Sequence, residues 1–476
     1  MSDTKVLPAV LRPHLALEVV VAMACLAQFM VVLDSTIVTV ALPGMRAALH
    51  LSTNQQQWVV TGYLVPLGGF LLLAARAGDL LGRRPVFLFG AFVFTGASLV
   101  GGLATGSTML LVARIVQGVG AAALAPTSLS LITASHTDER QRHKALALWS
   151  IMGGSASSIG VVVGGILTAE LSWRWVLFVN VPLGAGLLVA ASISLLPAPA
   201  ASGRGRLDLP GALSITLGMG SLSYGLSQAF PDGWGSVDVI VSFLAAAVLI
   251  GAFVVIEATS ARPLIPLGLF RPRSVRIGNL LMGGLGLTMT AMLFFLSLYF
   301  QQALGYGALR TGLALLPMTV VLVVGGLASR ALVPIVGPRR LLVVGALTTT
   351  AGLSWLAWLP THRAYLAHIL GPTLLTGAGV SLMLLSVTLT ATTGVDPEDA
   401  GAASGLLNSA RQLGGALGLA VFVTVAATVT SQHAHDTSYR AALVHGYQVV
   451  IVVNAAITLV AALVAGLLPR PRAATP

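Results

Sequence analysis

Two charged side chains stand inside long apolar segments and could carry protons. Asp34 lies in MVVLDSTIVTVALP (residues 30–43) and Arg114 in LLVARIVQGVGAAALAP (residues 110–126). An apolar environment favours the protonated form of a carboxyl group, whereas a neighbouring guanidinium favours the charged form. A carboxyl group held between these influences can take up and release a proton. We therefore predict that Asp34 and Arg114 form a proton-coupling pair; the alternative is an ion pair that only stabilises the fold.

The elements that must position this pair are membrane-spanning helices. The 476 residues are 56% hydrophobic and only 9% charged, whereas a soluble protein is about 25% charged. Apolar runs of roughly 20 residues recur along the chain, and each is long enough to cross a bilayer as a helix. We predict an all-α polytopic membrane protein with fourteen transmembrane helices, surrounded by the lipid bilayer.

The basic residues of the loops predict the orientation of the chain. Of the 26 lysines and arginines, Arg114 and Arg411 fall within predicted spans. If the N-terminus is cytoplasmic, nineteen of the others lie on the cytoplasmic side and five on the opposite side, and cytoplasmic loops carry such an excess. We expect a protein of the cytoplasmic (inner) membrane with both termini in the cytoplasm.

A weak internal repeat predicts two similar halves. GRRPVFLFG (residues 82–90) and GPRRLLVVG (residues 337–345) follow equivalent predicted helices. We predict an N-terminal six-helix half over 1–197, inserted helices 7 and 8 with cytoplasmic linkers over 198–275, and a C-terminal six-helix half over 276–476. Repeated halves of this kind are typical of transporters, with the binding site at their interface near the membrane midplane.

The energy source is predicted by what the sequence lacks. The lysines are Lys5 and Lys144, and neither follows the glycine of a phosphate-binding loop. Uphill transport would therefore draw on an ion gradient or on another subunit, and we expect no cofactor other than the proton gradient. No Ser/His/Asp set lies at a common depth, so we expect no enzyme.

Other classes of ligand are also disfavoured. The net charge of +11 is spread over short loops, so we expect no nucleic-acid partner. Cys25 is the single cysteine, which excludes disulfides within the chain and cysteine metal clusters. The segment containing His433, His435 and Asp436, with His445 nearby, shows no recognised ligand spacing, so we predict no metal site.

Glycines at four-residue spacing predict close contacts between helices. They occur in GGSASSIGVVVGG (residues 153–165) and GGALG (residues 414–418). The glycines that we assign to helix packing are Gly160, Gly164, Gly165, Gly414 and Gly418.

The motif GDLLGRR (residues 78–84) predicts a tight cytoplasmic turn between two helices. We assign Asp79, Gly82, Arg83 and Arg84 to a cytoplasmic gate; the alternative is a loop that only sets topology. Aromatic, amide and guanidinium side chains in the spans could bind an apolar or weakly polar compound. The predicted substrate-cavity residues are Trp58, Tyr63, Gln117, Tyr299, Gln301, Asn408, Arg411 and Gln412.

These motifs, taken in order, resemble those of a known family. LDSTIVTVALP, GDLLGRR and RIVQGVGAA, together with SWRWVLFVNVPLG (residues 172–184), resemble the fourteen-helix drug:proton antiporters of the major facilitator superfamily. LYFQQALGYGALRTGLALLP (residues 298–317) and GAASGLLNSARQLGGALGLA (residues 401–420) are similar to later signatures of that family. The resemblance implies the superfamily fold, proton coupling by Asp34 and Arg114, and gating by Asp79 and Arg83.

Four positions depart from the family pattern. Thr39 replaces an asparagine in the first motif, and Ala75 and Leu80 replace a glycine and a basic residue in the loop motif. Val161 stands where the antiporter motif has a proline. We predict a monomeric proton-coupled antiporter that exports small amphipathic organic compounds such as antibiotics; the alternative is proton-coupled or facilitated uptake of a metabolite.

Overall fold

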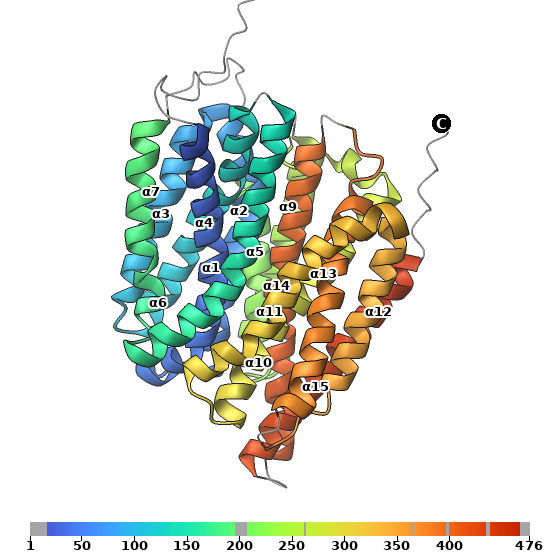
Figure 1. The fold of residues 1–476 in the computed structure, drawn as a ribbon. Coiled ribbons are helices and arrows are strands. Elements are labelled where there is room, and N and C mark those ends of the chain that lie inside the picture. Colours follow the sequence, from blue (N-terminus) through green and yellow to red (C-terminus); the bar gives the residue numbers. More distant parts are fainter. Residues whose placement is uncertain are drawn as a thin grey trace, which may run out of the picture.

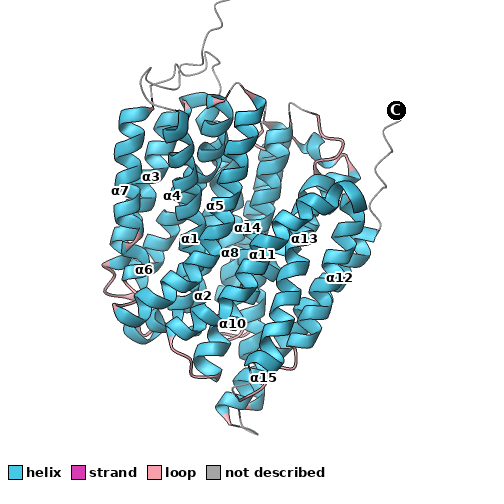
Figure 2. Ribbon diagram, viewed as in Figure 1, coloured by secondary structure: helices cyan, strands magenta, loops and turns pink. Residues whose placement is uncertain are grey.

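The protein is described here in a computed structural model. The described residues are 17–136, 138–195, 207–260, 263–362, 365–396, 399–434 and 438–466. All regular elements within these ranges are helices (Figure 2). Both chain termini, and several of the basic residues used to predict orientation, lie outside them.

The helices follow one another through short connections. The N-terminal group comprises α1 (Leu17–Leu49), α2 (Thr53–Leu81), α3 (Arg83–Gly102), α4 (Ser107–Ser135), α5 (Glu139–Glu170), α6 (Trp175–Phe178) and α7 (Asn180–Ser194). A middle group comprises α8 (Leu209–Gln228), α9 (Val237–Thr259) and the short 3-10 helix η1 (Leu267–Phe270). The C-terminal group comprises α10 (Arg273–Leu298), the π-helix η2 (Tyr299–Ala303), α11 (Ala308–Val336), α12 (Pro338–Leu356), the π-helix η3 (Leu366–Leu370), α13 (Gly371–Ala391), α14 (Ala400–His433) and α15 (Tyr439–Gly466).

The prediction of fourteen transmembrane helices is confirmed. Three predicted spans are each built from two consecutive helices: α6 with α7, α10 with η2, and η3 with α13. Among the described residues, twelve of the fourteen spans are both long enough and apolar enough to cross a membrane. The other two, α8 and α12, have 20 and 19 residues, which corresponds to about 30 Å of helix.

Local sequence sets where several of these helices begin. Before α2, Ser52 Oγ accepts a hydrogen bond from the Gln55 N–H at 3.1 Å, and Gln55 Oε1 accepts one from the Ser52 N–H at 3.0 Å. This reciprocal arrangement satisfies donors that a helix start leaves without partners. Asp138 and Ser236 cap α5 and α9 through their side-chain oxygens.

The N-terminal and C-terminal groups lie on opposite sides of one bundle (Figure 1). They contact each other mainly where α2 packs on α14 and where α5 packs on α11. The middle pair packs as a unit, with α9 on α8, and α8 lies against both α2 and α14. The domain boundaries near residues 197 and 275 stay predictions, and residues 196–206 lie outside the described ranges.

The internal repeat is visible in two backbone turns. Gly82 joins α2 to α3 with φ 95° and ψ 146°, and Gly337 joins α11 to α12 with φ 84° and ψ 148°. Residues that carry a Cβ atom rarely adopt a positive φ, so both turns favour glycine. The matching conformations place GRRPVFLFG and GPRRLLVVG at equivalent points of the two groups.

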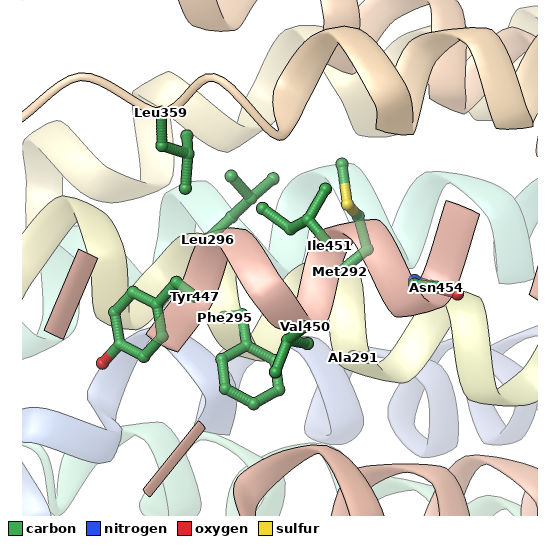
Figure 3. Close-up of a pocket in the computed structure, with 9 residues that line it drawn as sticks. All are labelled: Ala291, Met292, Phe295, Leu296, Leu359, Tyr447, Val450, Ile451 and Asn454. Atoms are coloured by element: carbon green, nitrogen blue, oxygen red, sulfur yellow. The ribbon is translucent and has the colours of Figure 1, made fainter. Parts of the chain in front are cut away.

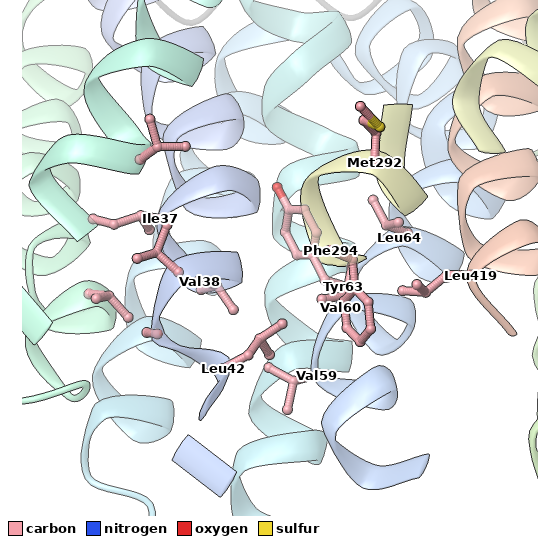
Figure 4. Packing of buried hydrophobic residues seen from close by; sticks show 14 of the residues in the cluster. Ile37, Val38, Leu42, Val59, Val60, Tyr63, Leu64, Met292, Phe294 and Leu419 are labelled. Carbon is pink, nitrogen blue, oxygen red and sulfur yellow. The ribbon is translucent and has the colours of Figure 1, made fainter. Parts of the chain in front are cut away.

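The bundle is closed at the end opposite these turns. Ser297 Oγ donates to the Thr39 carbonyl at 3.0 Å, and Gln301 Nε2 donates to the Val40 carbonyl at 3.0 Å. These bonds join α10 and η2 to the C-terminal part of α1. Apolar side chains of α1, α2, α10 and α14 pack together in the same core, as Figure 4 shows for Leu42, Val59 and Phe294 among others.

A small void of about 10 Å³ lies between α10 and α15 (Figure 3). Its one amide, Asn454, accepts a hydrogen bond from Thr288 Oγ1 at 2.9 Å. The volume is close to that of a single water molecule. We therefore regard this void as a feature of helix packing.

Candidate functional site

Asp34 is the centre of a buried polar cluster. Its side chain has no exposed surface, and its carboxylate accepts hydrogen bonds from three other side chains. Arg114 Nη1 lies 2.5 Å from Oδ2, while Gln117 Nε2 and Asn180 Nδ2 lie 2.7 and 3.0 Å from Oδ1. The structure thus brings together the two charges that the sequence singles out.

Arg114 is held in place by more than its ion pair. Its Nε donates to the Val59 carbonyl of α2 at 2.9 Å, and its Nη1 also donates to Gln117 Oε1 at 2.7 Å. Its guanidinium carbon lies 4.5 Å from the ring centroid of Tyr63, within the range of a cation–π interaction. The Tyr63 hydroxyl in turn donates to the Val31 carbonyl at 3.0 Å.

The sequence does not single out two members of this cluster. Asn180 begins α7 and is fully buried, and Ser98 of α3 accepts a hydrogen bond from Gln117 Nε2 at 2.8 Å. One signal was available for Asn180, because it is an amide within the apolar segment SWRWVLFVNVPLG. Buried amides need hydrogen-bond partners, so such a residue suggests a polar neighbour.

The cluster links five helices around one carboxylate. Asp34 lies on α1, its partners come from α4 and α7, and α2 and α3 contribute Tyr63 and Ser98. Removing one charge of a buried pair leaves the other uncompensated, which is costly. Protonation of Asp34 would therefore weaken its contacts to α4 and α7 together. In this conformation the carboxylate is sealed from solvent, so proton exchange requires the helices to move.

The predicted gate residues surround the α2–α3 turn. Asp79 is exposed, and the ion pairs within the described residues are Asp34–Arg114 and Glu139–Arg142. Asp79 and Arg83 are therefore not joined in this conformation. Arg84 Nη2 donates to the Ser192 carbonyl of α7 at 3.2 Å. A gating role for Asp79, Gly82, Arg83 and Arg84 stays a prediction.

The predicted substrate-cavity residues separate into several groups. Tyr63 and Gln117 belong to the Asp34 cluster described above. Trp58 faces α8, where its Nε1 donates to Ser227 Oγ at 3.2 Å.

The remaining five come from the C-terminal group. Tyr299 donates through its hydroxyl to the Pro360 carbonyl at 2.6 Å, and Gln301 contributes to the closed end. Arg411 donates to Asn408 Oδ1 at 2.8 Å. Gln412 lies where α14 approaches Gly68 of α2. Their assignment to a substrate cavity stays a prediction.

The five packing glycines all lie at close helix contacts. A side chain at Gly160 or Gly164 would collide with Thr36 or Ile37 of α1, and one at Gly165 would lie 2.8 Å from the Ala308 carbonyl of α11. Gly414 and Gly418 allow the same close approach of α14 to α10, at Gly283 and Leu287.

Comparison with known proteins agrees with this geometry. A model of the Major Facilitator Superfamily matches residues 24–419. The chain belongs to the major facilitator superfamily. Membership makes it a multi-pass membrane transporter for small molecules, in agreement with the fourteen helices.

Relatives within the superfamily include proteins named for antibiotic export and resistance. The chain is 43% identical over 412 residues to the cephamycin export protein CmcT of Amycolatopsis lactamdurans, covering 86% of this chain and 85% of that protein. It is 39% identical over 452 residues to the puromycin resistance protein pur8 of Streptomyces alboniger, covering 93% and 89%. The crystal structure of the nucleoside transporter NupG shares the fold, with a TM-score of 0.66 and 13% identity over 96% of this chain and 100% of that chain.

Proposed function

We propose that this transporter is a proton-coupled antiporter that exports small amphipathic organic compounds, including antibiotics. The observation that carries the proposal is the fully buried Asp34 carboxylate, bound by Arg114, Gln117 and Asn180. Ionisable residues inside the membrane are expensive to maintain and mark proton relays or substrate pathways. A carboxylate at the junction of five helices can transmit a change in its protonation to all of them.

The relatives support export rather than uptake. The two relatives described above are named for cephamycin export and puromycin resistance, and both match most of this chain. The replacement of the motif proline by Val161 motivates the alternative of uptake. In the structure the Val161 backbone packs closely on Gly312 of α11, which is a contact between helices and favours neither direction of transport.

The mechanism follows from the contacts of Asp34. When the closed end opens, a proton that enters from the outer side neutralises Asp34 and weakens its bonds to α4 and α7, and the end then closes again. Release of the proton to the cytoplasm restores the ion pair with Arg114. The proton gradient supplies the energy, and the residues of this chain need no bound cofactor for the cycle.

We also propose that the protein lies in the cytoplasmic membrane as a monomer, with both termini in the cytoplasm. The excess of basic residues on one side supports this orientation. A reporter that functions only in the cytoplasm should be active when it is fused to either terminus. A reporter that functions only outside the cytoplasm should be inactive there. Activity of a periplasmic reporter at either terminus would contradict it.

The direction of proton movement tests the proposal. Everted membrane vesicles are energised so that their lumen is acidic, and puromycin or a cephamycin is added outside. An exporter that exchanges protons for the compound will make the lumen more alkaline, while a symporter for uptake will make it more acidic. Vesicles containing Asp34→Asn should show no response, and the exposed Asp238→Asn should respond like the wild type.

A further inference from the structure

A second cavity lies on the side of the molecule, away from Asp34. We call it the lateral cavity; it has a volume of about 830 Å³ and is bounded by parts of α2, α8, α9, α10, α14, α15 and η1. Its walls include Phe253, Leu280, Leu413 and Val460. No residue of α1 or α4 lines it, so it is separate from the proton-coupling cluster.

The lateral cavity occurs where α9 stands apart from the helices of the C-terminal group, whereas α8 contacts α14. Helix α9 packs on α8, and residues 263–272 form the described part of the linker that precedes α10. Glu257 anchors this linker, because its carboxylate accepts a hydrogen bond from the Ile265 N–H at 3.0 Å. The anchored linker supplies Leu264, Ile265 and Phe270 to the cavity wall.

The walls are almost entirely apolar, with two polar exceptions. Asn279 Oδ1 and Ser409 Oγ are buried and have no hydrogen-bond partner in the described part of the chain. Buried polar atoms normally have a partner. A ligand that fills this space would therefore be mainly hydrocarbon and would carry a polar group near Asn279.

Two arginines continue the helical stripe that lines the lateral cavity. Arg273, Arg276 and Leu280 follow one another at intervals of three and four residues, so they share a face of α10. Both arginines are exposed, and neither has a carboxylate partner among the described residues. They lie about 6 to 10 Å below Leu280 along the helix, at the end that is predicted to be cytoplasmic.

We propose that the lateral cavity binds an anionic phospholipid of the cytoplasmic leaflet. One acyl chain fills the apolar space, the glycerol ester region lies near Asn279 and Ser409, and the phosphate lies at Arg273 and Arg276. The volume is within the range of about 300 to 1,000 Å³ that small-molecule ligands occupy. Glu257, the nearby acid, is 2% exposed and directed at the linker backbone. The bound lipid would join the middle pair to the C-terminal group.

Native mass spectrometry of the delipidated full-length protein tests this inference without measuring transport. The protein is incubated with equal amounts of phosphatidylglycerol and phosphatidylcholine that carry the same acyl chains. Gly284 lines the cavity, and a Cβ there meets no atom within 4 Å, so Gly284→Phe fills the space without a clash. Gly251→Phe on the exposed face of α9 is the matched control, since that position is equally open.

We expect one phosphatidylglycerol to remain bound in preference to phosphatidylcholine, and Gly284→Phe to lose it while Gly251→Phe keeps it. The double variant Arg273→Ala/Arg276→Ala should weaken binding about 25-fold, because each basic residue near an anionic group contributes roughly a factor of five. The exposed pair Arg140→Ala/Arg330→Ala should have no effect. Equal retention of both lipids, or lipid bound to Gly284→Phe, would overturn the proposal. Displacement of the lipid by puromycin would also overturn it and assign the cavity to the exported compound.

Discussion

At the scale of single residues, Asp34 can exchange its proton only when its surroundings change. The side chain is fully buried, and three donors already occupy its two oxygens. Each donor contacts the carboxylate, so loss of any one of them changes the surroundings in which Asp34 would bind a proton. Transport should therefore depend on Asn180 and Arg114 as well as on Asp34.

Replacement of Asn180 tests the member of the cluster that only the structure identifies. Asn180→Ala removes a hydrogen bond to a buried carboxylate, a contact worth about 1.5–3 kcal/mol. Gradient-driven transport should therefore fall about tenfold, because α7 no longer contacts the proton-carrying group. Proteoliposome assays under one imposed pH gradient measure this loss. Asn54 contacts α8 rather than Asp34, so Asn54→Ala should transport like the wild type, and a wild-type rate in Asn180→Ala would remove Asn180 from the coupling cluster.

Arg114→Ala should have a larger effect in the same direction. Without the guanidinium, Asp34 loses its ion pair with α4, so gradient-driven transport should be lost. Arg114→Lys keeps the charge but cannot contact Val59, Gln117 and Asp34 together, so it should be intermediate. An active Arg114→Ala protein with the wild-type pH profile would show that the two residues act independently.

At the scale of helices, close glycine contacts set how the two groups meet. Gly165 of α5 lies against the backbone of α11, while Gly326 of α11 has open space where a Cβ would stand. The sequence predicts such packing from glycine spacing, but not which neighbour each glycine contacts. Nor does it predict the break at Val179 between α6 and α7, which places Asn180 at the start of a helix beside Asp34. The spacing of residues along one helix does not show which residues of another helix will pack against it.

A larger side chain at Gly165 should prevent the closed end from forming. Gly165→Leu would push α5 away from Ala308, so the transporter should remain open at that end and lose most of its activity. Ser297→Cys, introduced with Cys25→Ser, provides a buried reporter for labelling by an impermeant maleimide. We expect the cysteine introduced at position 297 to be labelled faster in the Gly165→Leu variant than in the Gly326→Leu variant. Equal labelling in the two variants would show that this contact does not control closure.

At the scale of the whole molecule, the distribution of charge limits what can be exported. Asp34 is already paired, and the other acid buried in a described span, Glu257, is directed at the linker backbone. A permanent cation loses water when it enters the protein and needs a compensating charge.

The fourteen-helix fold could be predicted from the sequence because each span is a long apolar segment. The Asp34–Arg114 pair could be predicted because these two charges lie inside such segments. The lateral cavity could not, because it depends on how far α9 stands from α10.

Substrate charge should therefore affect transport. We expect neutral, anionic and monocationic amphiphiles to be exported and rigid dications to be exported poorly, because a second positive charge would have no partner. Efflux of a monocation and a dication of matched size, measured in the same cells, compares the two. Equal or faster export of the dication would show that another carboxylate, such as Glu170 or Glu257, takes part in binding.

The central claim is that Asp34 carries the proton that drives export. Its most direct test uses a compound that the wild type exports and measures its accumulation in proteoliposomes with an imposed pH gradient, for the wild type and for Asp34→Asn. Asparagine keeps the size of the side chain and one acceptor oxygen but cannot take up or release a proton. The account predicts that Asp34→Asn is inserted normally, binds the compound and accumulates none above the level without a gradient. Gradient-driven accumulation by Asp34→Asn at the wild-type rate would contradict it.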